Sequence, residues 1–357
     1  MKKWIFVAGC LFSLATHAQT NLVISATDEE AIKKLALEKD FSGTVLVLKG
    51  DSLVLSINQG KASETNGVAF SPDVRMNACS NGKSMTAVMI QQLIAKGILR
   101  PDQTVIEMLP DETQLPNAGK ITLQQLLTHT SGLGDFFEHP DYNTAKPVTT
   151  EDFMQLMRAM KPVNDTPGKA FAYSNGGYIV LGKILEKHYQ KPYQQIVKEQ
   201  LLLPLGIDTA QKHHTYATGY FKQDDKWTVG DGNDPDRWSA AGGIYLSVNE
   251  WHRFTKALAT GQLLDTASLR QAWTRYSRPE GNPDFVGYGR GFMIESPAGL
   301  TFIGHNGGIK GFQSAYRYVP QADMYIYVFS NHDGSAEAVF MYVLRNFIKQ
   351  YQQLSKS

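Results

Sequence analysis

The chain has 357 residues, 42% of them hydrophobic and 19% charged, a composition that supplies ample apolar material for a full globular core. Its 35 basic and 34 acidic residues give a formal net charge of +1. A balance this even provides no electrostatic reason to expect nucleic acid or an anionic membrane surface as a partner.

The N-terminal 18 residues have the layout of an export signal. Lys2 and Lys3 precede a short apolar run from Trp4 to Ala15, and small residues precede Gln19. The run is too short to cross a bilayer, and no later segment is long and apolar enough. We therefore expect a signal peptide at 1–18 and an exported protein, periplasmic or secreted, without an integral membrane segment.

The two cysteines predict no disulfide. Cys10 would be lost with the signal; the competing interpretation, a lipoprotein processed at Cys10, is disfavoured because only three apolar residues stand between the lysines and its processing box. Cys79 lies beside Ser80 and has no histidine nearby in the sequence to activate a thiol. We interpret Cys79 as a small buried residue.

The first predicted elements are a helix and a hairpin. Thr27 and Glu30 have the spacing of a capping box for a helix that continues to Lys39. Two valine- and leucine-rich strands follow, Thr44–Leu48 and Leu53–Ile57, joined by a glycine-containing turn.

The middle of the chain is mainly helical. The stretch from Ser80 to Ala95 is apolar on most faces, which indicates a buried helix. Leu123–Leu127 and Tyr178–His188 are also predicted to be helices. The acidic stretch Asp224–Asp236 is interpreted as a solvated loop, because it lacks the alternation and closing glutamate of a calcium loop.

The C-terminal part returns to strands and ends in an amphipathic helix, Ala336–Gln353. The predicted strands are Tyr288–Glu295, Leu300–Gly304, Ala315–Val319 and Met324–Ser330. Strands at both chain ends favour an α+β fold, in which one antiparallel sheet is built from both ends, flanked by helices, with an inserted helical lobe. We expect a single domain over 19–357, with an α/β lobe at about 19–76 plus 243–357 and a helical lobe at about 77–242.

Ser80 and Lys83 form the first candidate catalytic pair. A spacing of three places both side chains on one face of a helix. A serine hydroxyl needs a neighbouring base to become a good nucleophile, and burial near a helix N-terminus favours the neutral form of a lysine. Gly82-Lys83-Ser84 also ends like a phosphate-binding loop, but Asn77 stands where that motif needs glycine.

Two further patches complete the candidate site. Tyr173 can relay a proton, and Asn175 can hold a substrate amide. His305 and Gly307 fall on a predicted strand, and together with Asn175 and Gly308 they are the candidate substrate-binding or oxyanion residues. If this strand borders the cleft, the backbone N–H groups of Gly308 and Ser80 can form an oxyanion hole. No metal-ligand spacing is present, and we expect no metal and no cofactor.

Together these patches resemble the serine β-lactamase-like and penicillin-binding-protein-like family, which includes class C β-lactamases, DD-carboxypeptidases, D-aminopeptidases and esterases. Ser80 and Lys83 match its S-x-x-K motif, Tyr173-Ser174-Asn175 its Y-x-N motif, and His305-Asn306-Gly307 its H-x-G variant. The similarity runs from about Phe41 to Ile348. It implies that His129 belongs to a structural segment and not to the catalytic set.

The resemblance implies an acyl-enzyme on Ser80, with Lys83 and Tyr173 moving the proton. Class C β-lactamases have lysine where this chain has His305, and a histidine is largely neutral at pH 7. A peptide, amide or ester substrate is therefore favoured, as for D-amino-acid peptidases, DD-carboxypeptidases or esterases. The alternatives are a β-lactamase and a penicillin-binding sensor or scaffold without turnover.

Overall fold

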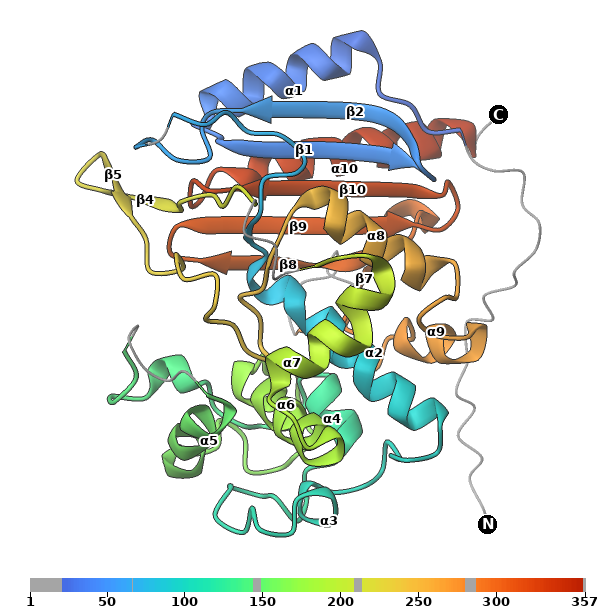
Figure 1. Ribbon diagram of the computed structural model, residues 1–357. Coiled ribbons are helices and arrows are strands. Elements are labelled where there is room, and N and C mark those ends of the chain that lie inside the picture. The colour runs from blue at the N-terminus through green and yellow to red at the C-terminus, as the bar shows by residue number, and fades with distance from the viewer. Residues whose placement is uncertain (1–20, 66, 144–148, 209–213, 280–286, 356–357) are drawn as a thin grey trace.

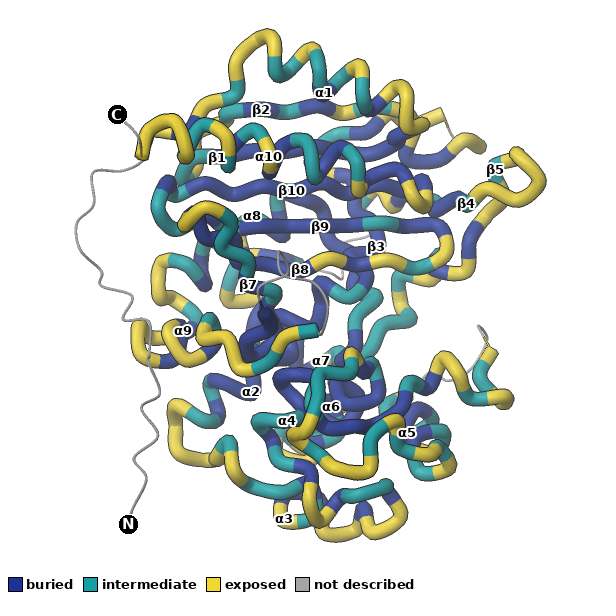
Figure 2. The backbone as a smooth tube through the Cα atoms, turned by 180° about the vertical axis from the view of Figure 1, so that it is seen from behind, coloured by how far each residue is buried: buried dark blue, intermediate teal, exposed yellow. Residues whose placement is uncertain are grey.

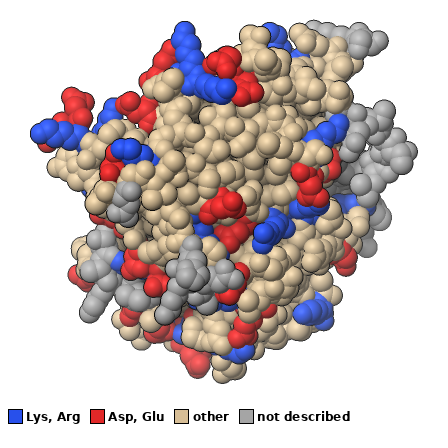
Figure 3. Space-filling view, turned by 45° about the horizontal axis from the view of Figure 1, so that its top comes forward, with Lys and Arg blue, Asp and Glu red and all other residues tan. Residues whose placement is uncertain are grey.

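The computed structural model describes residues 21–65, 67–143, 149–208, 214–279 and 287–355. The predicted export signal and Cys10 lie outside these residues. Within them, none of the helices combines the length and the apolar character needed to cross a membrane. On the face drawn in Figure 3, acidic and basic side chains are interspersed around an uncharged surface.

One antiparallel sheet organises the molecule, and its strands come from both chain ends, in the order β2-β1-β10-β9-β8-β7 (Figure 1). Neighbouring β1 and β10 pair from Gly43 opposite Ser330 to Lys49 opposite Met324. The strands of this sheet are β1 Gly43–Lys49, β2 Ser52–Gln59, β7 Met293–Glu295, β8 Phe302–Ile309, β9 Phe312–Val319 and β10 Met324–Ser330.

The central strands are buried on both faces, which divides the core in two (Figure 2). Val45 and Val47 of β1 pack against the helices α1 and α10, whereas Leu46 and Leu48 face the larger core that the sheet shares with the helical half. This is the period-two alternation of a strand, with an apolar residue at each of the positions 45–48. The predicted α+β fold is confirmed.

The helices fall into two groups. α1 and α10 cover one face of the sheet, while α8 packs on the other face and the remaining helices lie below the sheet in Figure 1. They are α1 Ala26–Glu38, α2 Gly82–Ala95, α3 Val105–Met108, α4 Leu123–Leu127, α5 Thr150–Ala159, α6 Asn175–Tyr189, α7 Tyr193–Val197, α8 Val248–Ala259, α9 Thr266–Ala272 and α10 Ala336–Leu354.

Three local predictions need correction. The capping box of α1 is made by Ser25 and Asp28, because Thr27 already lies inside the helix. The predicted strand Tyr288–Glu295 is regular only from Met293, since Gly289 and Gly291 bend the chain before it. Part of the predicted acidic loop is a strand, because a tight turn at 224–225 lets residues 226–229 pair with residues 220–223.

That strand is β5 (Lys226–Val229), which forms a hairpin with β4 (Tyr220–Gln223). Tyr220 bridges His332 at the end of β10, so the hairpin lies against the sheet half, although the predicted lobe boundaries assign it to the helical half. Two further short strands, β3 (Met76–Asn77) and β6 (Tyr245–Leu246), pair with each other. They lie where the chain leaves the sheet half before Ser80 and where it returns to it.

Candidate active site

Ser80 lies in a single 3₁₀ turn, Cys79–Asn81, between β3 and α2. Cys79 has φ 50°, a left-handed conformation that costs a non-glycine residue about 1 kcal/mol or more. Its neighbours hold it there: the Cys79 N–H donates to Asn77 Oδ1 over 2.8 Å, and the Cys79 carbonyl accepts from Gly243 N–H over 3.1 Å. The turn therefore fixes the position of Ser80 at the start of a buried helix.

Lys83 is fully buried and has three polar neighbours. Its Nζ lies 3.1 Å from Ser80 Oγ, 2.6 Å from Asn175 Oδ1 and 2.6 Å from the Ala241 carbonyl oxygen. Amide and carbonyl oxygens can only accept hydrogen bonds. A neutral amine has two N–H groups, which these two oxygens engage, so its lone pair is left for the Ser80 hydroxyl.

Burial is the main cause that lowers the pKa of Lys83, to about 7, while the carboxylate of Asp135 and, to a smaller extent, Cys79 act in the opposite direction. A substantial fraction of Lys83 is therefore neutral near pH 7, as a general base requires.

Asp135 fixes the orientation of the Asn175 amide, and the sequence-based interpretation missed it. Asn175 Nδ2 donates to Asp135 Oδ2 over 2.6 Å, which turns the amide oxygen toward Lys83. Asn175 therefore accepts a hydrogen bond from the candidate base Lys83, in addition to the substrate contact that the sequence predicted for it. Asp135 stands alone in a loop 40 residues earlier, and its only local signal is that it caps the short 3₁₀ turn Phe136–Glu138.

Tyr173 lies beside both catalytic candidates. Ser80 is close enough to the phenol to lower its pKa, and Lys83 Nζ lies 4.9 Å from the ring centroid. Although 36% of Tyr173 is exposed, burial raises the pKa of its phenol above the ordinary value, and the nearby Ser80 opposes that rise. The phenol stays protonated at neutral pH, so it can relay a proton, whereas Lys83 is better suited to accept the first one.

His129 supports Tyr173 from behind. The two rings pack with centroids 4.2 Å apart, and His129 Nδ1 accepts the Ser174 N–H over 3.1 Å. Burial lowers the pKa of His129 well below its ordinary value, so the ring is neutral. This placement is consistent with the structural segment that the family resemblance implies.

His305 is fully buried, so its ring does not reach the pocket surface. Its Nε2 and Tyr288 Oη are 2.8 Å apart, and burial, more than the nearby Lys83, lowers the pKa of His305 to about 3. The direct substrate contact that the sequence suggested for this side chain is not available in this placement. A neutral ring behind Tyr173 also supplies no cation for a substrate carboxylate.

Gly307 allows β8 to approach the turn that holds Ser80. A Cβ at this position would lie 2.6 Å from Cys79 Cβ and 2.8 Å from the Ser80 nitrogen, which a real side chain cannot do without a shift. The next residue, Gly308, is exposed and lines the same pocket as Ser80. The oxyanion hole formed by the Ser80 and Gly308 N–H groups stays a prediction.

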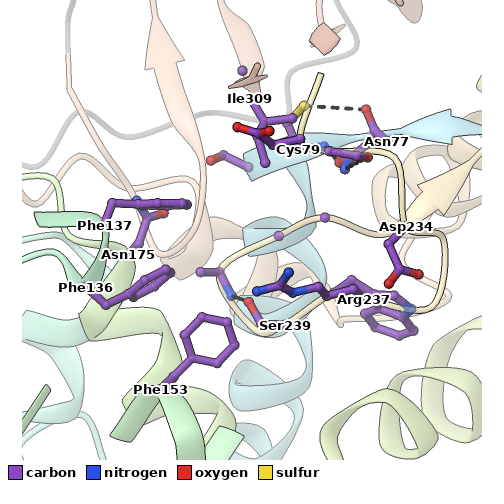
Figure 4. A pocket seen from close by; sticks show the side chains of 18 of the residues that line it. Asn77, Cys79, Phe136, Phe137, Phe153, Asn175, Asp234, Arg237, Ser239 and Ile309 are labelled. Atoms are coloured by element: carbon purple, nitrogen blue, oxygen red, sulfur yellow. Dashed lines mark hydrogen bonds between the residues drawn. The ribbon is translucent and has the colours of Figure 1, made fainter. Parts of the chain in front are cut away.

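A pocket between the halves opens onto Ser80 (Figure 4). Phe136, Phe137 and Phe153 lie on one side of it, and Asp234 and Arg237 on the other, with Asn175 beside the phenyl rings. Among the described residues, no group of histidine, cysteine and carboxylate side chains is arranged to hold a metal ion.

Known protein sequences are similar to this chain over most of its length. A family model described as Beta-lactamase matches residues 29–346. The putative penicillin-binding protein PbpX of Bacillus subtilis (strain 168) is 27% identical over 314 residues, which are 86% of this chain and 75% of that protein. A D-aminopeptidase of Cereibacter sphaeroides (strain ATCC 17029 / ATH 2.4.9) is 25% identical over 305 residues, 83% of this chain and 58% of the relative.

Solved structures share the fold. A penicillin-binding protein from Bacillus halodurans superposes with a TM-score of 0.78 at 24% identity and covers 88% of this chain and 98% of its own. The D-amino acid amidase from Ochrobactrum anthropi SV3, in complex with D-phenylalanine, superposes with a TM-score of 0.73 at 21% identity, covering 91% and 98%.

Proposed function

Because the chain belongs to the β-lactamase family, we propose that it is a serine hydrolase that forms an acyl-enzyme on Ser80 and cleaves an amide, peptide or ester. The relatives include proteins named D-aminopeptidase and penicillin-binding protein, and both names are compatible with attack on a carbonyl carbon. A D-amino-acid peptide or amide is the first substrate class to test.

The reaction follows from the neighbours of Ser80. Neutral Lys83 takes the hydroxyl proton as Ser80 Oγ bonds to the substrate carbonyl carbon. The resulting tetrahedral intermediate collapses, the bond from carbon to the leaving nitrogen or oxygen breaks, and the leaving group takes a proton through Lys83 and Tyr173. Water then attacks the Ser80 ester, releases the acid and restores the hydroxyl.

One observation carries the proposal: two of the three polar neighbours of the buried Lys83 amine can only accept hydrogen bonds, and the third is the Ser80 hydroxyl. The low pKa of Lys83, about 7, agrees with this proposal.

A β-lactamase is the weaker alternative. The buried neutral His305 offers no positive charge at the strand where a β-lactam carboxylate would be held. The other alternative is a sensor or scaffold that is acylated by β-lactams and does not turn them over, and the relative named penicillin-binding protein supports it.

The test is hydrolysis of p-nitrophenyl acetate, a D-alanyl peptide, a D-amino-acid amide and a cephalosporin by the native protein and by Ser80→Ala. We expect turnover of an ester or amide that falls by at least a thousandfold in Ser80→Ala, with an acyl adduct on Ser80 visible by intact-mass spectrometry. Turnover that persists in Ser80→Ala contradicts the proposal, and a stable adduct without turnover indicates the sensor.

Export is also proposed, on the basis of the basic and apolar start of the sequence. Expression of the full chain in a bacterial host and N-terminal sequencing of the product test it. We expect a mature N-terminus at Gln19 in an extracytoplasmic fraction. A lipid on Cys10 would contradict this and would support the lipoprotein alternative.

A further inference from the structure

Four aromatic rings form a cluster beside the nucleophile, on the helical side of the pocket. The Phe136 ring centroid lies 4.6 Å from that of Phe137, 4.6 Å from that of Phe153 and 5.6 Å from that of Tyr142. Phe137 and Tyr142 are in turn 4.9 Å apart, in an edge-to-face arrangement. We call these four residues the aromatic wall.

The aromatic wall is part of the same pocket as Ser80, and its outer ring is open. All four residues line the pocket together with Ser80, and Figure 4 shows the three phenylalanines on one side of it. Phe136 and Phe153 are buried and hold the wall in place, whereas Phe137 is 48% exposed. An exposed phenyl ring on a rigid base gains contact area and favourable ring geometry when a second aromatic group covers it, worth about 0.5–1.5 kcal/mol beyond the area that is buried.

The opposite side of the pocket carries charge. Asp234 and Arg237 lie there, and Asp231 also lines the pocket, which gives two negative groups against one positive group and a formal charge of −1. A third carboxylate, Asp135, stands behind Asn175. An acyl group that bears a carboxylate would add a like charge to this side, so the pocket favours an acyl group without negative charge.

We propose that the aromatic wall is an acyl-group subsite, which accepts an uncharged aromatic side group of the substrate while its carbonyl carbon meets Ser80. The inference rests on the proposed acyl-enzyme function and adds to it the class of acyl group. Phe137 is the specificity-determining residue, because it is the exposed ring of the wall and lines the pocket together with Ser80.

The test compares two esters that share a leaving group, p-nitrophenyl acetate and p-nitrophenyl phenylacetate. For Phe137→Ala we expect kcat/KM for the phenylacetyl ester to fall roughly five- to tenfold, and kcat/KM for the acetyl ester to change by less than about twofold. For each ester, kcat/KM of the variant is divided by kcat/KM of the native enzyme, which removes the difference in intrinsic reactivity between the two esters. Phe137→Leu, which keeps an apolar group, should recover part of the loss.

Phe221→Ala is the matched control, because this phenylalanine lies on the β4–β5 hairpin and does not line the pocket. It should leave both esters unaffected, and melting temperatures should verify that all variants are folded. A further ester with a carboxylate on the phenyl ring should react more slowly with the native enzyme than the phenylacetyl ester.

The outcomes separate the two proposals. Equal losses for both esters in Phe137→Ala, or no loss for either, overturn the aromatic subsite while Ser80-dependent turnover still supports the hydrolase. If neither ester is hydrolysed and neither acylates Ser80 in the native protein, the hydrolase proposal fails, and the subsite proposal fails with it.

Discussion

At the scale of single residues, the protonation state of Lys83 is decided by its neighbours. Burial lowers its pKa to about 7, and Asp135 limits that shift through its charge while also orienting Asn175. The same carboxylate therefore has two effects on the base, one electrostatic and one geometric. Because Lys83 must be neutral to accept the Ser80 proton, acylation should rise as pH increases through the Lys83 pKa.

For the native protein we expect the acidic limb of kcat/KM against pH to have its midpoint near 7. Asp135→Asn removes the charge that raises the Lys83 pKa, so that pKa falls and the limb moves to lower pH. The new amide can also donate to Asn175 Oδ1, so the orientation of Asn175 is no longer enforced, and the pH-independent rate should fall roughly tenfold.

Asp102→Asn, which neutralises an exposed carboxylate that pairs with Arg100 and is not among the charges acting on the Lys83 pKa, serves as the control and should leave the limb in place. A limb that moves to higher pH in Asp135→Asn would contradict the assignment of Lys83 as the base. A rate loss without any movement of the limb would reduce Asp135 to a structural role.

At the scale of elements, the site depends on how closely β8 approaches the turn that holds Ser80. Gly307 is the contact point, and Ser314 on the neighbouring β9 also fixes this turn, since its hydroxyl donates to the Ala78 carbonyl over 2.9 Å. The strand and the turn come from opposite ends of the chain, and their separation sets the space above Ser80.

We expect Gly307→Ala to force β8 away from Ser80. Overpacking of this kind costs about 1–3 kcal/mol of unfolding free energy, and the displaced strand should lower kcat more than a hundredfold. Denaturant unfolding and ester hydrolysis measure the two effects. Gly119→Ala is the control, because no atom lies within 4 Å of the added Cβ; native activity in Gly307→Ala would show that the close approach is not required.

At the scale of the whole molecule, the two chain ends stabilise one core. α10 packs across the sheet together with α1, and Phe347 of α10 is fully buried among residues from both ends. The pairing of β1 with β10 joins the ends a second time. This arrangement predicts that damage at the C-terminal helix destabilises the whole fold.

Phe347→Ala should lower the free energy of unfolding by about 3–5 kcal/mol, because it leaves a cavity between α10 and the sheet. Leu37→Ala, at a position in α1 that is 67% exposed, should change it by less than about 0.5 kcal/mol. Urea denaturation of both variants decides this. A small effect of Phe347→Ala, or one that leaves the Ser80 turn stable while α10 unfolds separately, would show that the ends are not one cooperative unit.

The sequence alone determined what depends on local spacing. The run of apolar residues in β1 and β10, the three-residue interval from Ser80 to Lys83 and the turn residues are local patterns, and the predicted β10 and α4 agree with the structure to the residue. Local signals failed at Tyr288, where glycine bends interrupt a strand-like composition, and at the acidic stretch after Asp224, where pairing with β4 forms a strand.

Only the tertiary structure decided which groups surround Ser80 and Lys83. Asp135 has no spacing that links it to Asn175, and His305 carries no local mark of its burial behind Tyr173. Hydrophobic periodicity and helical intervals follow from the covalent chain, so a sequence expresses them directly. The direction of a lone pair and the pKa of a buried amine depend instead on groups that come together only when both ends of the chain fold into one sheet.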